Sequence, residues 1–460
     1  MELPNRLKTP SFLQKLQWVA DPVTYMDNAV QKYPDIFTAD IVGFGNTIVF
    51  VHHPQGIQEI LSNDKNKLAA LSEPNRILQP LVGEDSFFLL DQTHHKQRRQ
   101  ILMPPFHGER MRGYGQLICN LTENVLKNLP KNEPFSAHTV MQEISLQVIL
   151  EAIFGLYEGE CCQKLKHLFP LLLSIFHSPL TSSFFFFPFL QKDFSWSPWG
   201  KFLQQKQKID EILYAEIAER RENISLDRID ILSLLMSAQD DQGKQMSDKE
   251  LRDDLITLIF AGHETTATSI AWGIYWIHKT PKVLEKLLDE IDGLGDHPDP
   301  MSIARLPYLT AVCNEILRIT PVAIFTLPRI VQETIQVLEH QLEPGTVVVG
   351  CIYLTHKRQD LYPEPMEFKP ERFLENQFSP YEFIPFGGGS RGCIGQAFAL
   401  FEMKLVLATA LSNYKLALAD QPLERPQRRG VTLAPANGVK VVITGQRKPC
   451  KPYVAMTNDK

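Results

Sequence analysis

The sequence predicts a single, mainly α-helical fold with a minor β component. Helical periodicity dominates the 460 residues, and the clearest helical segments are 113–129, 138–156, 201–222, 281–292 and 396–412. Strand-like segments are few: 36–51, which forms two segments around a Gly-Phe-Gly-Asn turn, then 346–354 and 438–444. No linker, charge block or internal repeat divides the chain, so we expect one domain over residues 1–460.

Composition narrows the class of protein. A hydrophobic content of 44% and a charged content of 22% are those of an ordinary globular protein, and a net charge of -6 does not favour nucleic-acid binding. Residues 1–20 lack the apolar run of a membrane span or a secretory signal, so we expect no membrane anchor, and 445–460 is expected to be a loose tail. Seven cysteines without a CxxC motif indicate neither a disulfide framework nor a zinc site, which favours the reducing cytoplasm.

The longest predicted helix spans residues 247–278. It begins at a capping box, Ser247-Asp-Lys-Glu250, and Thr280-Pro281 ends it and starts the next helix. Its middle is apolar on nearly all sides, which is typical of a helix in the protein interior. Polar residues within it therefore need a reason.

The run Ala261-Gly262-His263-Glu264-Thr265-Thr266 interrupts this apolar helix. A glycine leaves room for a flat or small ligand against the helix, and a threonine hydroxyl that bonds a backbone carbonyl can loosen the helix locally. The neighbouring acid and alcohol can relay protons. Satisfied polar residues within an ordinary helix are the alternative.

Cys393 lies in the run Phe386-Gly-Gly-Gly-Ser-Arg-Gly-Cys393-Ile-Gly395, directly before the helix expected from residue 396. Three glycines allow positive φ angles and close approach to a flat ligand, and Arg391 adds a fixed cation. The start of the following helix is expected to stabilise a thiolate and lower its pKa. Such a sulfur suits a nucleophile or a metal ligand, with a buried structural cysteine as the alternative.

The pattern Phe-x-x-Gly-x-Arg-x-Cys-x-Gly resembles the haem-binding loop of the cytochrome P-450 superfamily, with Phe386, Gly389, Arg391, Cys393 and Gly395 in its five fixed positions. The resemblance covers essentially the whole chain, with its landmarks in family order. It implies a haem b between the long central helix and the cysteine loop, with Cys393 as the axial iron ligand. It also implies that Glu264 and Thr265 are the acid–alcohol pair of oxygen activation.

Two further landmarks follow from the resemblance. Glu315-x-x-Arg318 would form a buried structural triad with Arg372 behind the cysteine loop, although a surface ion pair is the usual meaning of that spacing. His95 and Arg99 would donate to the haem propionates, as would Arg329 and Arg391. His94 and Arg98 stay open as alternatives to His95 and Arg99, and a solvated basic face is the alternative to both.

The family's substrate-facing segments are apolar here. The pocket residues implied by the resemblance are Phe87, Phe88, Ala261, Val322, Ile324, Phe325, Val431 and Thr432. The aromatic segment from 184 to 199 would lie over the substrate entrance, where it could touch lipid, with core packing as the alternative. These features favour a lipophilic substrate such as a fatty acid, an alkane or a terpenoid.

The implied function is a haem-thiolate monooxygenase that uses O2 to oxidise a C–H or C=C bond. No flavin or iron–sulfur domain is recognisable, so electrons from NAD(P)H are expected through a separate ferredoxin and its reductase, or a flavodoxin, delivered to a monomer. A basic docking face is expected from Lys96, Arg98, Arg110 and Arg112, with solvated side chains as the alternative. Two other functions stay open: a non-oxygenating or peroxide-using haem-thiolate enzyme, and a haem-based ligand sensor.

Overall fold

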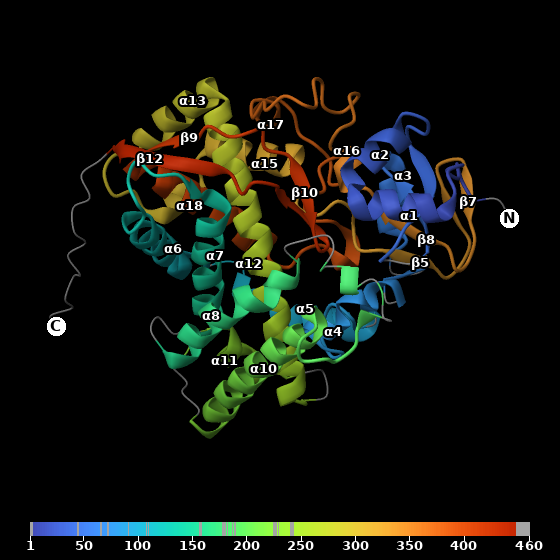
Figure 1. Ribbon diagram of the computed structural model, residues 1–460, viewed down its shortest axis with the longest axis horizontal. Helices are drawn as coiled ribbons and strands as arrows, with labels where there is room; N and C mark the ends of the chain where they lie inside the picture. Colours follow the sequence, from blue (N-terminus) through green and yellow to red (C-terminus); the bar gives the residue numbers. More distant parts are fainter. Residues whose placement is uncertain are drawn as a thin grey trace.

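A helix of 32 residues, α12 (Asp248–Lys279), runs through the middle of the computed structural model (Figure 1). The predicted capping box is present, because the Ser247 side chain accepts from the backbone of Glu250 and the Glu250 side chain accepts from the backbone of Ser247. Pro281 then begins α13 (Pro281–Asp292). The structure describes residues 3–447 except 44–45, 65–66, 71–72, 91, 107, 109, 156–158, 177–180, 182, 186, 188–189, 224–227, 229 and 240–242.

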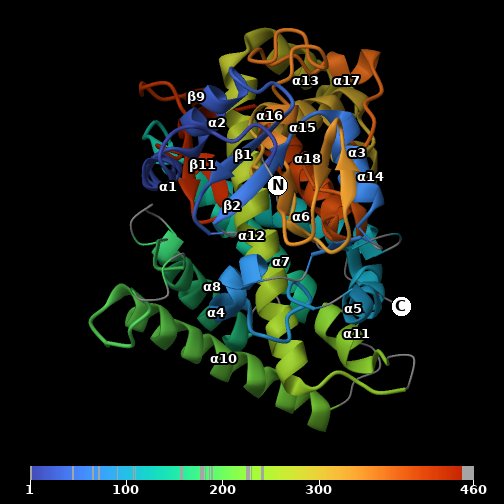
Figure 2. The same ribbon diagram turned by 90° about the vertical axis from the view of Figure 1, so that its right-hand side faces the viewer.

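The helices around α12 form the main body of the molecule. α7 (Ala137–Phe154) packs along α12, and α18 (Gln396–Asn413) packs against both α12 and α6 (Arg110–Lys127). α10 (Pro198–Glu222) crosses the N-terminal part of α12 (Figure 2). The remaining helices are α1 (Ser11–Ala20), α2 (Pro22–Val30), α3 (Pro54–Ser62), α4 (Gln79–Val82), α5 (Gln92–Leu102), α8 (Glu160–Leu173), α11 (Ile231–Ser237), α14 (Pro300–Ala304), α15 (Pro307–Ile319), α16 (Ile352–Thr355) and α17 (Arg372–Glu375).

The largest sheet lies beside this helical body and has the strand order β1-β2-β8-β5-β3. Its strands are β1 (Ile36–Asp40), β2 (Thr47–Val51), β8 (Val347–Gly350), β5 (Arg329–Val331) and β3 (Leu68–Ala69). β1 and β2 pair antiparallel, as predicted for 36–51, whereas β2 and β8 pair parallel. The strand expected over 346–354 was too long, because the chain turns at Cys351 into the short helix α16.

Among the described residues, the β component also includes three small sheets. β12 (Lys440–Gln446) is central between β4 (Phe135–Ser136) and β9 (Tyr414–Leu418), close to the strand predicted at 438–444. β10 (Pro426–Arg429) pairs with β11 (Thr432–Pro435), and β6 (Ile335–Val337) pairs with β7 (His340–Leu342). The mainly α prediction with a minor β component is confirmed. Most of the expected tail, 448–460, lies outside the described residues.

Two hydrophobic cores position the cysteine loop and the middle of α12. The larger core joins α7, α12, α15 and α18 with the segment around Phe87, and a second core joins α1 and α2 to β1, β2 and Ile324. Among the described residues, no helix combines the length and the apolar character that crossing a membrane requires.

Candidate functional site

The cysteine loop takes the backbone shape that its glycines predict. Gly387 and Gly389 have φ angles of 64° and 66°, which only glycine adopts readily. A Cβ at Gly388 would lie 2.7 Å from Leu61 Cδ1, so a side chain there would clash with α3. The backbone amide of Cys393 donates to the carbonyl of Phe386 over 2.9 Å, which closes the loop.

The loop presents the Cys393 side chain in an exposed position, and α18 follows from Gln396 with Gly395 as its N-cap. The expectation of a lowered thiol pKa was wrong. Although the residue reaches the surface, desolvation of the sulfur by its loop raises the pKa of Cys393, and this outweighs the backbone amide of Gly395 and the charge of Arg99, which lower it.

Cationic side chains gather beside this loop. Arg99 Nη1 donates over 2.6 Å to the carbonyl of Gly392, and Arg391 Nη2 donates over 2.6 Å to the carbonyl of Leu90. The ring of His95, which is 4% exposed, lies among them. Burial lowers the pKa of His95 to about 3, with further lowering by the charges of Arg391, Arg99 and Arg329. So much positive charge around one neutral ring makes a place for an anion.

The side chains of Arg98 and Arg99 lie on different faces of α5. Arg98 is 8% exposed and donates to Asp254 over 2.5 Å and to Glu250 over 2.6 Å, both on α12. It therefore ties α5 to α12 and is turned away from the cysteine loop. The prediction that Arg98 belongs to an exposed docking face was wrong for the same reason. His95 and Arg99, four residues apart, share the face toward the loop.

Asp64 was missed by sequence reasoning. It forms a buried ion pair with Arg329 and accepts from the backbone amide of Ser390 over 2.8 Å and from its hydroxyl over 2.7 Å. Burial alone would raise the pKa of Asp64, but the hydrogen bonds and charge of Arg329 and the bonds from Ser390 hold it below its usual value. Asp64 thus links Arg329 to the cysteine loop. Its neighbours in the sequence are polar and do not predict this role.

Glu315, Arg318 and Arg372 form one buried network. Arg318 donates two hydrogen bonds to Glu315, of 2.6 and 2.8 Å, and Arg372 Nε donates to Glu315 over 3.1 Å. Both members of the first pair are 0% exposed, which excludes a surface ion pair. A charge so deep in the protein persists only with partners, so the three side chains depend on one another.

His356, also missed, carries this network to the cysteine loop. Arg318 donates to the His356 carbonyl over 2.9 Å, and the His356 ring nitrogen Nε2 accepts from the backbone amide of Ile384 over 3.0 Å, two residues before Phe386. Because Nε2 accepts, the ring is neutral. Burial, with the Arg318 charge, lowers its pKa to about 3.

On α12, Thr265 Oγ1 donates over 2.6 Å to the carbonyl of Ala261, the local bond expected of a hydroxyl in this run. Glu264 turns instead toward α7, where Gln142 Nε2 donates to its Oε2 over 2.6 Å and His138 Nε2 lies 3.3 Å from its Oε1. Burial would raise the pKa of Glu264, but the hydrogen bond and charge of His138, the charge of His263 and the hydrogen bond from Gln142 outweigh it and hold the pKa at about 2.

The predicted pocket residues fall into separate groups. Phe87 and Phe88 lie side by side with ring centroids 5.2 Å apart. Val322 accepts from the backbone amide of Leu433 over 2.9 Å, which brings it next to Thr432. Val431 is half-buried and packs against both apolar cores.

Two other pocket predictions pack elsewhere. Ile324 belongs to the core around α1 and α2, and Phe325 stacks on Trp18 with ring centroids 6.2 Å apart. These contacts favour core packing for Phe325, and its contact with substrate stays a prediction.

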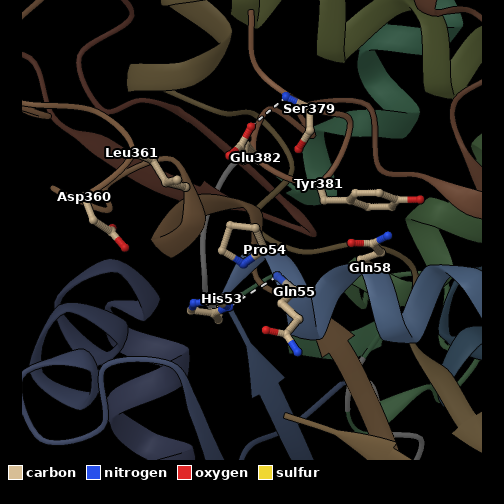
Figure 3. Close-up of a pocket in the computed structure, with 9 residues that line it drawn as sticks. All are labelled: His53, Pro54, Gln55, Gln58, Asp360, Leu361, Ser379, Tyr381 and Glu382. Atoms are coloured by element: carbon tan, nitrogen blue, oxygen red, sulfur yellow. Dashed lines mark hydrogen bonds between the residues drawn. The ribbon is translucent and has the colours of Figure 1, made fainter.

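A polar cleft of about 330 Å³ lies elsewhere, between the start of α3 and the segment before the cysteine loop (Figure 3). Its lining residues are His53, Pro54, Gln55, Gln58, Asp360, Leu361, Ser379, Tyr381 and Glu382. The His53 ring caps α3 by accepting from Gln55 over 3.2 Å, and Glu382 accepts from the Ser379 amide over 2.7 Å. These bonds have structural roles and none of the predicted site residues lies here.

Comparison with known proteins decides the family. The family model described as "Cytochrome P450" matches residues 4–441. The chain belongs to the cytochrome P450 family. Members of this family are monooxygenases that hold a haem through a cysteine thiolate and use O2, so this cytochrome P450 is an oxidoreductase of that kind.

Named relatives agree with this assignment. "Putative cytochrome P450 135B1" of Mycobacterium tuberculosis is 32% identical over 448 residues, covering 97% of this chain and 92% of that protein. "Putative cytochrome P450 138" of the same organism is 33% identical over 445 residues and 96% of each chain. The solved structure "Retinoic acid bound cyanobacterial CYP120A1" shares the fold with a TM-score of 0.85 at 22% identity, over 97% of this chain and 99% of that one.

The side chains of this cytochrome P450 fit a haem. An exposed thiol stands in a loop too tight for a side chain at Gly388, and the charges of Arg99 and Arg391 act together on nearby His95, so that these guanidinium groups suit the binding of carboxylates. Within the described ranges, no cluster of three or more His, Cys, Asp or Glu side chains could hold a metal ion. A single thiol suits an iron whose other ligands belong to a porphyrin.

Proposed function

We propose that Cys393 is the axial ligand of the haem and that the enzyme inserts one oxygen atom from O2 into a C–H or C=C bond of a lipophilic small molecule. The observation that supports this most strongly is the gathering of Arg99, Arg391 and His95 at the cysteine loop, which gives a carboxylate-bearing flat cofactor its anchor. Phe386 and Gly395 close the loop on either side of the sulfur. Arg329 reaches the same region through Asp64.

When bound, the haem supplies oxygen activation, with the thiolate donating electron density that favours cleavage of the O–O bond. Cys393 would hold the iron as a thiolate, a form that the backbone amide of Gly395 and the charge of Arg99 favour. Arg99 fixes the loop by donating to the carbonyl of Gly392, the residue before Cys393. The triad of Glu315, Arg318 and Arg372 stabilises the same loop through His356.

Glu264 and Thr265 are the proposed proton carriers. The Thr265 hydroxyl donates to the carbonyl of Ala261. This bond holds the hydroxyl oxygen in place on α12, where it can exchange its hydrogen-bond partners. Glu264 is an anion at neutral pH in the position that the structure gives it. Because Glu264 holds no proton at neutral pH, it must first take one up from solvent before it can deliver one. Proton delivery is therefore controlled by a few residues.

Electrons from NAD(P)H are proposed to come through a separate ferredoxin and its reductase, or a flavodoxin, to a monomer in the cytoplasm. Lys96 on α5 and Arg112 on α6 are exposed, and both helices contact the turn Pro104–Phe106 between them. These side chains, with Arg110, are the proposed docking cations for an acidic partner. Arg98 is left out because it is buried.

The substrate is proposed to be a fatty acid, an alkane or a terpenoid that enters past Phe87 and Phe88 toward Ala261, Val322 and Val431. The described residues of segment 184–199, which leave out 186 and 188–189, include both buried and exposed aromatic side chains. Phe185 and Trp199 are each 4% exposed, whereas Trp196 is 76% exposed and stacks on Phe194 at 5.6 Å. Trp196 and Phe194 are therefore the proposed point of contact with lipid or with a greasy substrate.

Reconstitution tests this function directly. The full chain, loaded with haem, is given NADPH, a ferredoxin with its reductase, and panels of fatty acids, alkanes and terpenoids, and spin-state titration selects the ligands that bind. We expect an O2-dependent product that carries one added oxygen. Tight binding of such ligands with no product would favour a ligand sensor, and product formed only with peroxide would favour the peroxide-using alternative.

A further inference from the structure

A polar seam runs between α7 and α12 at the level of Glu264. His138, Gln142 and Ser145 are four and three residues apart, so they lie on one face of α7. Gln142 Nε2 donates to Glu264 Oε2 over 2.6 Å, and His138 Nε2 lies 3.3 Å from Glu264 Oε1. Each carboxylate oxygen therefore faces a nitrogen of α7.

The proton on the His138 ring is fixed by a third element, β10. Arg429 Nη1 lies 3.4 Å from His138 Nδ1, and because a guanidinium only donates, Nδ1 must accept. The single ring proton of a neutral His138 then sits on Nε2, the nitrogen that faces Glu264 and lies 3.1 Å from Thr268 Oγ1. His138 is 2% exposed in its side chain, so water does not compete for this arrangement.

Other ionisable groups face the seam. On α12, His263 is 2% exposed and lies next to Glu264 in sequence; burial lowers its pKa, and the charge of Glu264 opposes that lowering. On α18, Glu402 is 1% exposed and bonds Ser145, whose hydroxyl lies 3.5 Å from the carbonyl of Gly262; burial raises the pKa of Glu402 to about 8. Burial therefore favours the uncharged form of both His263 and Glu402.

Resting on the proposed function, we propose that His138 and Gln142 are positioning residues that hold Glu264 ionised and turned onto α7. Two N–H donors favour the carboxylate, whereas a carboxylic acid loses most of that attraction. Arg429 makes the hold possible by keeping His138 a donor at Nε2.

Infrared titration of the haem-loaded full chain in its resting ferric state tests this without turnover. The C=O band of a protonated Glu264 is identified by its absence in Glu264→Gln. In the wild type we expect no such band at neutral pH. Loss of one charge-assisted hydrogen bond, in Gln142→Leu or His138→Leu, is expected to raise the titration midpoint by about 1–2 pH units, and the double variant to raise it further.

Matched variants separate positioning from general disturbance. His138→Gln replaces the ring with an amide N–H that can reach Glu264, so it is expected to restore the wild-type midpoint. Thr139→Val, at an exposed neighbour on α7, is expected to leave the midpoint unchanged. If His138→Leu does not fold, half-buried Gln142→Leu supplies the same test.

A midpoint in His138→Leu and Gln142→Leu equal to that of the wild type would overturn the inference, as would a Glu264 already protonated in the wild type at neutral pH. The reduced carbon-monoxide spectrum of the same samples is read in parallel. A thiolate-type spectrum with an unmoved midpoint rejects the positioning role alone, whereas loss of that spectrum in the wild type rejects the proposed function.

Discussion

Arg99 donates a hydrogen bond of 2.6 Å to the carbonyl oxygen of Gly392, the residue directly before Cys393. One side chain of α5 thus holds the loop that carries the sulfur, although 293 positions separate the two residues in sequence. Its neighbour Arg98 points the other way, to two carboxylates of α12. The two adjacent arginines therefore have different roles: Arg99 holds the cysteine loop, and Arg98 joins α5 to α12.

Arg99→Gln is expected to weaken haem binding. The variant loses a charge-assisted hydrogen bond and a cation of the anion site, worth about 1.5–3 kcal/mol, which is roughly a 10- to 100-fold loss of haem affinity. The transfer of haem to an apoprotein acceptor measures the rate of haem dissociation and the haem affinity. Lys96→Gln removes an exposed charge from the same helix and is the control. Equal haem affinity in both variants would contradict the assignment of Arg99.

The buried triad is expected to dominate local stability. Glu315→Gln leaves Arg318 and Arg372 without their carboxylate in the protein interior, at a cost of about 3–5 kcal/mol. A large fall in the thermal unfolding midpoint of the haem-loaded protein is the expected result. Lys164→Gln, which breaks the exposed pair with Glu160 on α8, is expected to leave the midpoint unchanged. A similar small effect for both would mean that the network is not needed for the fold.

Removing haem is expected to make stability depend on pH through His95. The folded, haem-free protein keeps this ring neutral down to about pH 3, whereas the unfolded chain protonates it near pH 6.5. Stability therefore falls as the pH falls from about 6.5 to about 3.

Thermal unfolding of the apoprotein across this range measures the dependence. His95→Gln is expected to flatten it, and exposed His167→Gln is not. An unchanged slope in His95→Gln would show that other groups cause the dependence.

Thr265→Ala is expected to bind haem normally but to waste electrons. Without the hydroxyl, protons are no longer delivered at one position, so reducing equivalents leave as hydrogen peroxide instead of oxidised product. The ratio of peroxide to NADPH consumed measures this. Thr310→Ala removes the same type of bond, Oγ1 to the carbonyl of Leu306, from α15 and is the control. Unchanged coupling in Thr265→Ala would count against a proton role.

Local patterns predicted much of this molecule because the physics behind them is local. The capping box at Ser247, the glycine angles of the cysteine loop and the helix starts depend on residues a few positions apart. The family motif added which residues belong together. Glu315 and Arg318 were placed correctly because their spacing and the family pattern agree.

Partners from distant elements could not be predicted in the same way. Nothing near Asp64 indicates that it pairs with Arg329, and nothing in the run His-His-Lys-Gln-Arg-Arg shows that Asp254 lies opposite Arg98. The pKa of Cys393 was also misjudged, because a helix start can be seen in sequence whereas burial by the rest of the fold cannot. Likewise, nothing near Phe325 in sequence shows that Trp18, over 300 positions away, stacks on its ring.

The central claim is that the Cys393 thiolate holds the haem iron, and the reduced carbon-monoxide spectrum tests it most directly. The wild type is expected to give the strongly red-shifted Soret band that thiolate ligation produces, and Cys393→Ser, reconstituted with haem in the same way, is expected to lack it. Cys351→Ser, at a fully buried cysteine outside the loop, is expected to retain it. A thiolate-type band that persists in Cys393→Ser would contradict the account.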